Sequence, residues 1–355
     1  MSAAPRPKKP TIATVAAQAG VAVSTVSRYL NGHYVSREVR ARLSDIIAEL
    51  GYSRSWTARN LSLGRRGSIG VVVDSSHDPW FVQLLTGIEE ELSTRDTSLM
   101  LASTELRSEY DPALVFEWIR DGRVDGLIVA KSQRRERSLF KAAVDAGLPT
   151  VAVVPDENVT HVQVLRSNNL AAGTLVAHHL ADLGHRQIGF VGGPKHSIDS
   201  QHRERGLREG LAKRGIVLDP TQVFSCSKWD VDAGSAFAAE FLARPLAVTA
   251  LVLANDALAF GFMGVALRRG IRLPDDLSVV GFDGLPQGAL LYPALTTVSQ
   301  PMREMGRVAC RRLFEALEDP GRLEKVEFPM ELIVRESTIP VRAAPPVERH
   351  LRPVN

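Results

Sequence analysis

The stretch Thr11–Asn31, TIATVAAQAGVAVSTVSRYLN, predicts two short helices joined by a tight turn. Apolar residues recur at helical spacing directly after Thr11, whose hydroxyl suits a helix N-cap. Gly20 suits the turn because glycine accepts a positive φ at little cost. The second helix, Val23–Leu30, would bury an aliphatic side and expose hydroxyls and Arg28. Such a face can approach DNA bases and read guanine, although an ordinary helical hairpin with a solvated polar face has the same pattern.

The following segment favours the DNA-binding interpretation. Ser36 precedes a third helix pattern that stops at Gly51, and three short helices with few large apolar residues are typical of a small DNA-binding headpiece. Residues 1–66 contain eleven lysines and arginines but three acids, a net charge of +8, whereas the whole chain of 355 residues carries +3. A basic end on an acidic body is the charge pattern of a nucleic-acid-binding module joined to another domain.

Alternating strand and helix patterns follow from Ser68. Short, continuously apolar strands such as SIGVVVD and LSVVGFD alternate with helices in two successive runs, the second of which begins near Leu170. Strands of this kind are buried on both faces, so we predict two Rossmann-like lobes with parallel sheets. The strand LTTVSQP would open a segment that crosses back to the first lobe. Ligands of such folds bind in a cleft at the carboxyl ends of the strands.

Composition and motifs argue against several other classes. The two cysteines, Cys226 and Cys310, show neither metal-ligand spacing nor a disulfide framework, and no histidine cluster indicates a metal. The sequence has no Ser-His-Asp order, nucleophile elbow, Walker loop or dinucleotide-binding glycine pattern, so we expect neither an enzyme nor a cofactor. The basic N-terminus lacks the apolar core of a signal peptide, and the most apolar window carries Asn255 and Asp256 at its middle. We therefore expect a cytoplasmic protein with no membrane partner.

The helix-turn-helix sequence TIATVAAQAGVAVSTVSRYLNG resembles that of the LacI/GalR family of bacterial transcription regulators, and the resemblance extends from Thr11 to about Pro340. It implies an α/β protein with a small all-α headpiece and a two-lobed, periplasmic-binding-protein-like effector domain. The expected parts are a basic arm over 1–10, the headpiece over 11–54, a hinge helix or linker over 55–66, the two-lobed effector and dimerisation domain over 67–341 and a tail over 342–355. Lobe 1 would comprise about 67–166 plus 301–328, and lobe 2 about 167–300 plus 329–341.

The resemblance also implies a set of DNA contacts. They are base readout by Val23, Ser24 and Arg28, phosphate contacts by Thr25, Ser27 and Asn31, and a minor-groove wedge by Leu61. A leucine wedge kinks DNA at a cost of a few kcal/mol of unstacking, offset by new contacts along the bent duplex. The alternative for Leu61 is a side chain half-buried against the next domain.

The effector-binding positions of the family fall at strand ends and in the loops that follow them. An aromatic face with acid, amide and arginine groups around it suits a polyhydroxylated or heterocyclic ligand, because the ring covers apolar surface while the polar groups bind hydroxyls. The residues at the matching positions are Asp78, Trp80, Phe81, Arg203, Trp229, Asn255, Asp283 and Gln300.

Structural roles stay open for some residues of the cleft. Trp229 could be a core residue of a surface loop, and Asp283 could cap the turn before Gly284. For Asp256, we expect a helix N-cap rather than a ligand contact. His185 fits a packing and hydrogen-bonding role at a helix–strand turn.

Two positions depart from the family pattern. Val154 and Pro155 follow a strand where sugar-responsive members often carry Asp-Arg, and Asn168-Asn169 stands where Asp-Asn is usual. That side of the cleft has lost an acid and a base, while Asp78 adds an acid on the other side. A sugar is the default effector, but a nucleoside or another small polar metabolite stays open.

We therefore expect a sequence-specific DNA-binding transcription regulator, and more specifically a repressor. It would bind a palindromic operator as a homodimer, since two headpieces must read two half-sites. A small polar ligand in the cleft would change the spacing of the hinge helices and hence operator binding. The tail lacks a leucine heptad, so we see no coiled coil for tetramers. The alternative is a small-molecule-binding protein or an enzyme on the same lobes without a DNA role.

Overall fold

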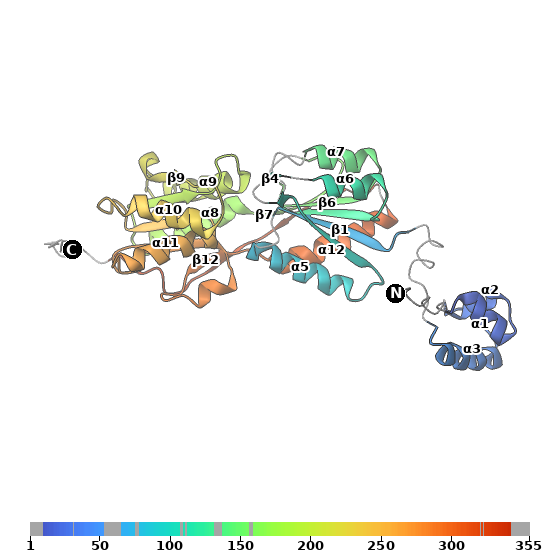
Figure 1. Ribbon diagram of the computed structural model, residues 1–355. Helices are drawn as coiled ribbons and strands as arrows, with labels where there is room; N and C mark the ends of the chain where they lie inside the picture. The colour runs from blue at the N-terminus through green and yellow to red at the C-terminus, as the bar shows by residue number, and fades with distance from the viewer. Residues whose placement is uncertain are drawn as a thin grey trace, which may run out of the picture. The chain divides into compact units, whose positions relative to one another are not determined.

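The chain divides into two compact units, residues 1–67 and 68–355 (Figure 1). The computed structural model describes residues 10–30, 32–52, 65–74, 78–106, 109–110, 112–130, 137–155, 159–319, 321 and 323–341.

Unit 1 contains, within its described residues, the helices α1 (Ile12–Ala19), α2 (Val23–Leu30) and α3 (Arg37–Leu50). The predicted caps are confirmed. The hydroxyl of Thr11 accepts a hydrogen bond from the third amide of α1, and Ser36 caps α3 in the same way. Gly20 and Gly51 end α1 and α3 at φ values of 61° and 58°. The small core under these helices consists of Val15, Ala16, Ala19, Val26, Leu43 and Ile46.

Two six-stranded sheets form the framework of unit 2, and each defines one lobe. The lobe 1 sheet has the order β13-β7-β6-β5-β1-β2 and is parallel throughout. Its strands are β1 (Ser68–Val73), β2 (Ser98–Ser103), β5 (Gly126–Ala130), β6 (Thr150–Val153), β7 (Gln163–Ser167) and β13 (Lys325–Phe328). A separate hairpin consists of β3 (Glu105–Leu106) and β4 (Glu109–Tyr110).

The lobe 2 sheet has the order β14-β12-β11-β10-β8-β9, and β14 alone runs antiparallel to its neighbour. Its strands are β8 (Ile188–Gly192), β9 (Val223–Ser225), β10 (Ala250–Leu253), β11 (Ser278–Asp283), β12 (Thr296–Ser299) and β14 (Glu331–Ile333). The two sheets follow the same order strand for strand, so the predicted pair of Rossmann-like lobes is confirmed.

Helices cover both faces of each sheet. Lobe 1 carries α5 (Pro79–Leu92) with α12 (Met302–Glu318) on one face and α6 (Ala113–Arg120) with α7 (Arg137–Asp145) on the other. Lobe 2 carries α8 (Asn169–Asp182) with α9 (Ile198–Ala212) on one face and α10 (Val231–Phe241) with α11 (Asp256–Arg268) on the other. Two 3-10 turns are η2 (Pro220–Gln222) and η3 (Pro286–Ala289). Successive strand residues enter opposite cores, which explains why the strands are continuously apolar.

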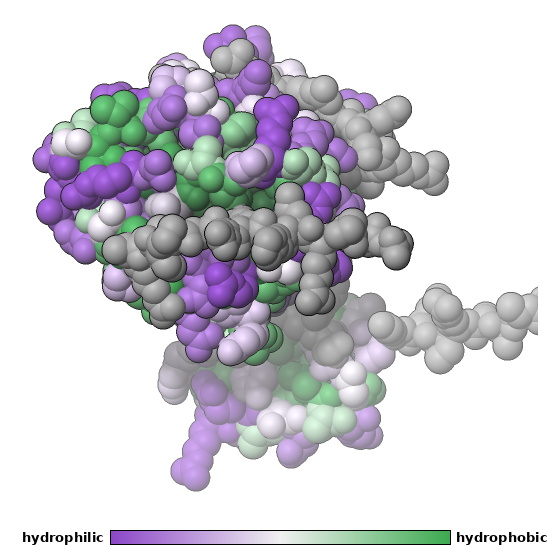
Figure 2. All heavy atoms as spheres, turned by 90° about the vertical axis from the view of Figure 1, so that its left-hand side faces the viewer, coloured by the Kyte–Doolittle hydropathy of each residue, from purple (hydrophilic) through white to green (hydrophobic). Residues whose placement is uncertain are grey.

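Three chain segments connect the lobes: the one after β7, the one after β12 and the one after β13. The segment after β12 leads into α12, which packs on α5 in lobe 1. All three segments begin at carboxyl ends of strands. The carboxyl edge of each sheet, where the cleft is expected, is therefore also the edge at which the chain crosses between the lobes. Figure 2 looks at lobe 2 end-on and shows hydrophilic and hydrophobic residues interspersed over that face.

Some elements were not assigned from the sequence. These are the strands β3, β4, β7, β9, β13 and β14 and the helices α10 and α12. In the described part of the chain, no helix has the length and apolar character needed to cross a membrane.

Candidate functional site

The predicted DNA-reading face lies on α2. Val26 on its inner side is fully buried, so the opposite side of the helix points outward. The side chains predicted to read bases, Val23, Ser24 and Arg28, are exposed, and those predicted to contact phosphates, Thr25 and Ser27, are half-buried. Asn31 and Leu61 lie outside the described residues. The exposed face thus has the composition and the placement that base readout requires.

A small polar cavity in lobe 2 gathers four of the predicted effector-binding residues. Its volume is about 10 Å³, which is room for one water molecule. The side chains come from α9, from the segment before α10 and from the carboxyl ends of β10 and β11. They are Asp199, Arg203, Trp229, Asn255 and Asp283.

Arg203 is the centre of the hydrogen bonding around this cavity. Its guanidinium is 3% exposed and donates from Nε to Asn169 Oδ1 at 2.7 Å. Its Nη1 donates to the carbonyl oxygen of Ala254 and lies 3.4 Å from Asp283 Oδ1. The ring of Phe282 lies 4.9 Å from the guanidinium carbon. A buried arginine bound by a carboxylate and by several other oxygens is held in one position.

Asp283 and Gln300 are joined directly. Gln300 Nε2 donates to Asp283 Oδ1 at 2.5 Å, and the backbone amide of Gln300 donates to the Asp283 carbonyl at 3.1 Å. The backbone of Asp283 has a φ of 112°, a region that residues other than glycine rarely adopt. Such backbone strain recurs at ligand clamps, where the surrounding structure enforces it.

Asn255 and Trp229 have structural roles as well as a place in the cavity wall. Asn255 caps α11 by accepting from the Leu258 amide at 2.8 Å, and its Nδ2 donates to the Trp229 carbonyl at 2.9 Å. The half-buried indole of Trp229 lies so close to Gly193 that a Cβ there would meet ring carbons at 2.5 Å. Trp229 also packs against both hydrophobic clusters of lobe 2, which agrees with its alternative role as a loop core residue.

The predicted cap role of Asp256 is wrong, because Asn255 caps the helix and Asp256 is its first residue. The carboxyl of Asp256 is completely buried and accepts from the Thr297 hydroxyl at 2.6 Å and from the Leu285 amide at 2.7 Å. Burial, together with the nearby charge of Asp283, raises the pKa of Asp256 well above its usual value. This carboxyl ties the turn after β11 to β12 behind the cavity.

The lobe 1 residues predicted to bind the effector lie elsewhere. Asp78 caps α5 by accepting from the Trp80 amide at 2.9 Å. Trp80 and Phe81 are 1% exposed and form an edge-to-face pair with ring centroids 5.1 Å apart. Their hydrophobic cluster includes Leu285 from lobe 2. The structure thus places these aromatic rings in the core where the lobes meet, with their faces covered by protein.

The two departures from the family pattern also occupy defined positions. Val154 is buried at the end of β6 with a φ of 51°, a strained conformation for a β-branched residue. Arg166 Nη1 donates to the carbonyl of Pro155 at 2.8 Å. Asn168 caps α8 and donates to Glu327 Oε2 at 2.7 Å, while Asn169 bonds to Arg203. The change from an acid at Asn168 therefore alters a helix cap outside the small cavity.

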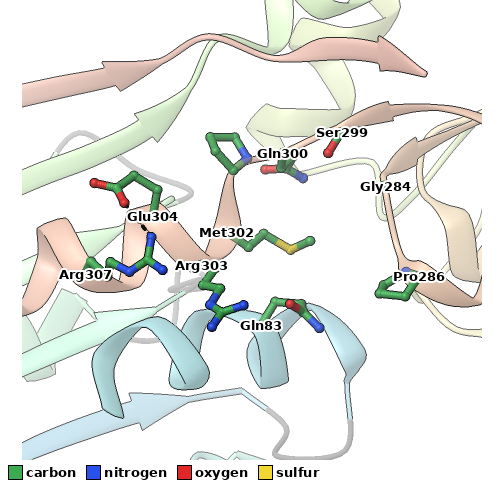
Figure 3. Close-up of a pocket in the computed structure, with 10 residues that line it drawn as sticks. Gln83, Gly284, Pro286, Ser299, Gln300, Met302, Arg303, Glu304 and Arg307 are labelled. Atoms are coloured by element: carbon green, nitrogen blue, oxygen red, sulfur yellow. Dashed lines mark hydrogen bonds and ion pairs between the residues drawn. The ribbon is translucent and has the colours of Figure 1, made fainter. Parts of the chain in front are cut away.

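A larger hollow of about 350 Å³ lies between α5 of lobe 1 and the turn after β11 of lobe 2 (Figure 3). Of the predicted residues, only Gln300 lines it. The other lining residues are Gln83, Gly284, Pro286, Ser299, Pro301, Met302, Arg303, Glu304 and Arg307. The two arginines carry ion pairs to Glu90 or Glu304, so their charges are already compensated. The convergent polar groups of the smaller cavity therefore indicate the chemistry of a ligand better than the lining of the larger hollow does.

Sequence reasoning missed Asp199 and Asn169 as members of the polar site. Asp199 precedes Arg203 by four residues on α9, and this spacing puts both on one helix face. Asn169 donates to Asp199 Oδ1 at 2.8 Å and accepts from Arg203, which fixes the orientation of its amide. The spacing of Asp199 was a readable signal, whereas the role of Asn169 depends on a contact across two helices.

No histidine or cysteine that the structure describes lines the small polar cavity. His185 is buried and bonds Thr249 Oγ1 at 2.8 Å and the Ile339 carbonyl at 3.1 Å, as its predicted packing role requires. Burial raises the pKa of Cys226 to about 11 and that of Cys310 to about 12, which disfavours the thiolate form that acts as a nucleophile or metal ligand. Among the described residues, no group of three potential ligands could hold a metal ion.

Comparison with known families and proteins gives two matching regions. Residues 11–55 match the model of bacterial regulatory proteins, lacI family, and residues 177–338 match a periplasmic binding protein-like domain. The chain is 31% identical over 331 residues to the ribose operon repressor of Halalkalibacterium halodurans, with 92% of this chain and 97% of that protein covered.

Two solved structures extend the comparison. A complex of the transcriptional regulator CelR with cellobiose is 29% identical, with a TM-score of 0.70 over 93% of this chain and 100% of that chain. A lac repressor dimer bound to operator is 24% identical, with a TM-score of 0.81 over 94% of this chain and 100% of that chain. The second shares the fold of this chain.

Proposed function

This chain belongs to the LacI family of bacterial regulatory proteins, and from that membership we propose how its two units work together as a transcriptional repressor under the control of a sugar-like ligand. The observation that carries the proposal is the α2 face, where Val23, Ser24 and Arg28 stand exposed above a buried Val26. The headpiece over 11–54 reads DNA, the segment 55–66 connects it to the effector domain, and neither part has a catalytic role.

The operator is palindromic and the repressor is a homodimer. A headpiece with three short helices and one exposed reading face contacts only a short half-site, so useful specificity needs two copies. Two-fold protein symmetry then implies two-fold operator symmetry. Because operator DNA is chromosomal, the repressor works in the cytoplasm.

The effector site is the small polar cavity around Arg203. Two carboxylates, one amide, a guanidinium and the Trp229 ring converge there, and such groups bind hydroxyls and cover the apolar face of a sugar ring. The present volume of about 10 Å³ is too small for a sugar, so binding requires the residues that line the cavity to move apart. Relatives associated with ribose or cellobiose support a carbohydrate as the ligand class.

The DNA-binding part is tested by selecting operators from a randomised duplex pool with the full chain and then comparing variants. Arg28→Ala should lose about 1–3 kcal/mol of binding to the selected site relative to unrelated DNA, because one bidentate base contact disappears. Arg42→Ala, another exposed arginine of unit 1, is the matched control and should keep the discrimination. Unchanged discrimination in Arg28→Ala would remove this residue from base readout.

The effector part is tested by thermal unfolding against D-ribose, cellobiose, polyols, sugar phosphates and nucleosides. A ligand at 100 times its dissociation constant stabilises the domain that binds it by about 2.7 kcal/mol. We expect a neutral sugar to raise the melting temperature of wild type but not of Asp283→Asn. A nucleoside or a sugar phosphate as the best ligand would contradict the carbohydrate assignment.

A further inference from the structure

Five buried residues form a closed ring of hydrogen bonds where the lobes meet, and Asn169 closes it by donating from Nδ2 to the backbone carbonyl of Ser167 at 3.4 Å. Each is at most 5% exposed. In order around the ring they are Ser167, Gln300, Asp283, Arg203 and Asn169. Asp283 and Arg203 belong to the small polar cavity, whereas Ser167 and Gln300 belong to two different segments that connect the lobes.

The direction of each bond in this ring is fixed by chemistry. The Asp283 carboxylate only accepts, so the Gln300 amide must present Nε2 to it, at 2.5 Å. The amide oxygen of Gln300 then faces Ser167, whose hydroxyl donates to it at 2.8 Å. The carboxylate and the Ser167 hydroxyl bind the two ends of the Gln300 amide, and loss of the hydroxyl removes the bond to the amide oxygen. The Ser167 hydroxyl therefore holds Gln300 in the orientation that the carboxylate sets.

The contact between Ser167 and Gln300 joins two of the chain segments that connect the lobes. Ser167 is the last residue of β7, where the chain leaves lobe 1 for α8. Gln300 follows β12, where the chain returns from lobe 2 to α12 (Figure 3). The two segments run in opposite directions between the lobes, so a change in the angle between the lobes changes the Ser167–Gln300 contact.

We propose that Ser167 is a positioning residue that acts through Gln300 to hold Asp283 in place and that links the effector site to the angle between the lobes. The link rests on the proposed function, since it makes the effector carboxylate and the hinge parts of one ring. Ser167 itself contacts Gln300 and Met305, with its Oγ 3.6 Å from the sulfur, and lines neither cavity.

Hydrogen exchange measured by mass spectrometry on the full chain tests the link without any ligand. Ser167→Ala should speed exchange of the backbone amides over 283–290, in the other lobe, by about 2- to 10-fold, the range that one hydrogen bond is worth. Thr150→Val is the matched control. It removes another buried lobe 1 strand hydroxyl that donates one bond, to the Leu148 carbonyl at 2.9 Å, and should leave 283–290 unchanged.

Two further variants separate positioning from a general loss of stability. In a Gln300→Met background, Ser167→Ala should add nothing to the exchange over 283–290, because the mediating amide is gone. Ser167→Thr keeps a hydroxyl and should restore the wild-type rate. If Ser167→Ala does not fold, Ser167→Cys, which keeps the size with a weak donor, replaces it with the same prediction. An effect confined to residues around Ser167, or one that persists in Gln300→Met, would overturn the proposal.

A titration with D-ribose completes the test. If wild type binds ribose, Ser167→Ala should weaken binding by the same 2- to 10-fold factor, and Thr150→Val should not. Ribose binding that is equal in all three proteins, with equal exchange, would refute the positioning role and leave the proposed function standing. No ribose binding by wild type, with the exchange difference present, would instead remove ribose as effector and keep the role of Ser167.

Discussion

Arg203 is a buried cation, and its hydrogen-bond partners offset the free energy needed to bury it. A guanidinium out of water is tolerated only when its donors are satisfied, and here oxygens from Asn169, Ala254 and Asp283 surround it. These partners come from three different parts of the chain: α8, the residue after β10, and β11. The cation therefore joins three segments that form the wall of the small polar cavity.

Replacement of Arg203 by lysine should lower the stability of the protein, because lysine cannot make all of these hydrogen bonds. Arg203→Lys keeps the charge but cannot reach three oxygens in a fixed fork, so we expect a loss of about 2 kcal/mol in the free energy of unfolding. Urea denaturation of the full chain measures it. Arg205→Lys on the same helix has an exposed side chain paired with Glu209 at 2.7 Å and should change stability by less than about 0.5 kcal/mol. Equal midpoints for the two variants would contradict this view of Arg203.

His185 makes the stability of unit 2 dependent on pH. Burial lowers the pKa of His185 below its ordinary value of 6.5, so the folded state keeps this ring neutral while the unfolded state takes up a proton first. Stability is therefore lost as the pH falls below about 6.5. We expect the melting temperature of wild type to fall between pH 7.5 and pH 5 more steeply than that of His185→Gln. His202→Gln, at an exposed site, should follow wild type, and parallel curves for all three would exclude His185 as a source.

At the scale of secondary-structure elements, both lobes contain pairs of closely packed helices. Paired glycines lie where two helices cross, and a Cβ on either would meet the backbone of the other helix within 2.3 Å. The pairs are Gly87 with Gly306 between α5 and α12, Gly173 with Gly206 between α8 and α9, and Gly234 with Gly261 between α10 and α11. The absence of side chains at these crossings lets the helices approach closely and fixes their relative position.

Gly206→Ala should disturb one such crossing. Its Cβ would lie 2.0 Å from the Leu170 carbonyl oxygen, a backbone atom that cannot turn away. We expect a loss of about 1–3 kcal/mol in the free energy of unfolding, as for other overpacked sites. Gly264→Ala is the control, because its Cβ would meet only the end of the Arg268 side chain, at 3.4 Å. That variant should be neutral or gain up to about 1 kcal/mol from helix propensity.

The two lobes share one fold, so residues at equivalent strand ends can be compared directly. β6 and β11 hold the same place in their sheets, and each is followed or ended by a residue with positive φ, Val154 in lobe 1 and Asp283 in lobe 2. The lobe 2 position carries a carboxylate within the polar ring, whereas the lobe 1 position is apolar. The polar recognition groups gathered in the small cavity all come from lobe 2.

Coupling between effector and operator should be reciprocal in the whole molecule. If ligand changes operator affinity by a given factor, operator must change ligand affinity by the same factor, and such coupling is typically about 1–3 kcal/mol. Titration of the full chain with the sugar, with and without saturating selected operator, measures one side of this relation. The operator titration with and without sugar measures the other. Equal sugar affinity with and without operator would show that the two sites are not coupled.

The sequence alone determined the headpiece and the alternation of strands and helices. Thr11, Gly20, Ser36 and Gly51 place the ends of α1 and α3, because caps and turns are local and depend on neighbours within a few residues. Strands buried on both faces are visible as short apolar runs for the same reason. The family resemblance added Arg203, Trp229, Asn255 and Asp283, which the fold brings to one cavity.

The tertiary structure alone decided the polar partners that lie far apart in the chain. β7 was not recognised because it contains Gln163 and Arg166, and both find distant oxygens: Gln163 donates to the Arg312 carbonyl at 3.0 Å across 149 positions. Asp256 is a buried carboxyl rather than a cap, since its donors come from residues 29 and 41 positions later. A buried polar group is stable only with a partner, and a partner so distant in sequence is chosen by the fold.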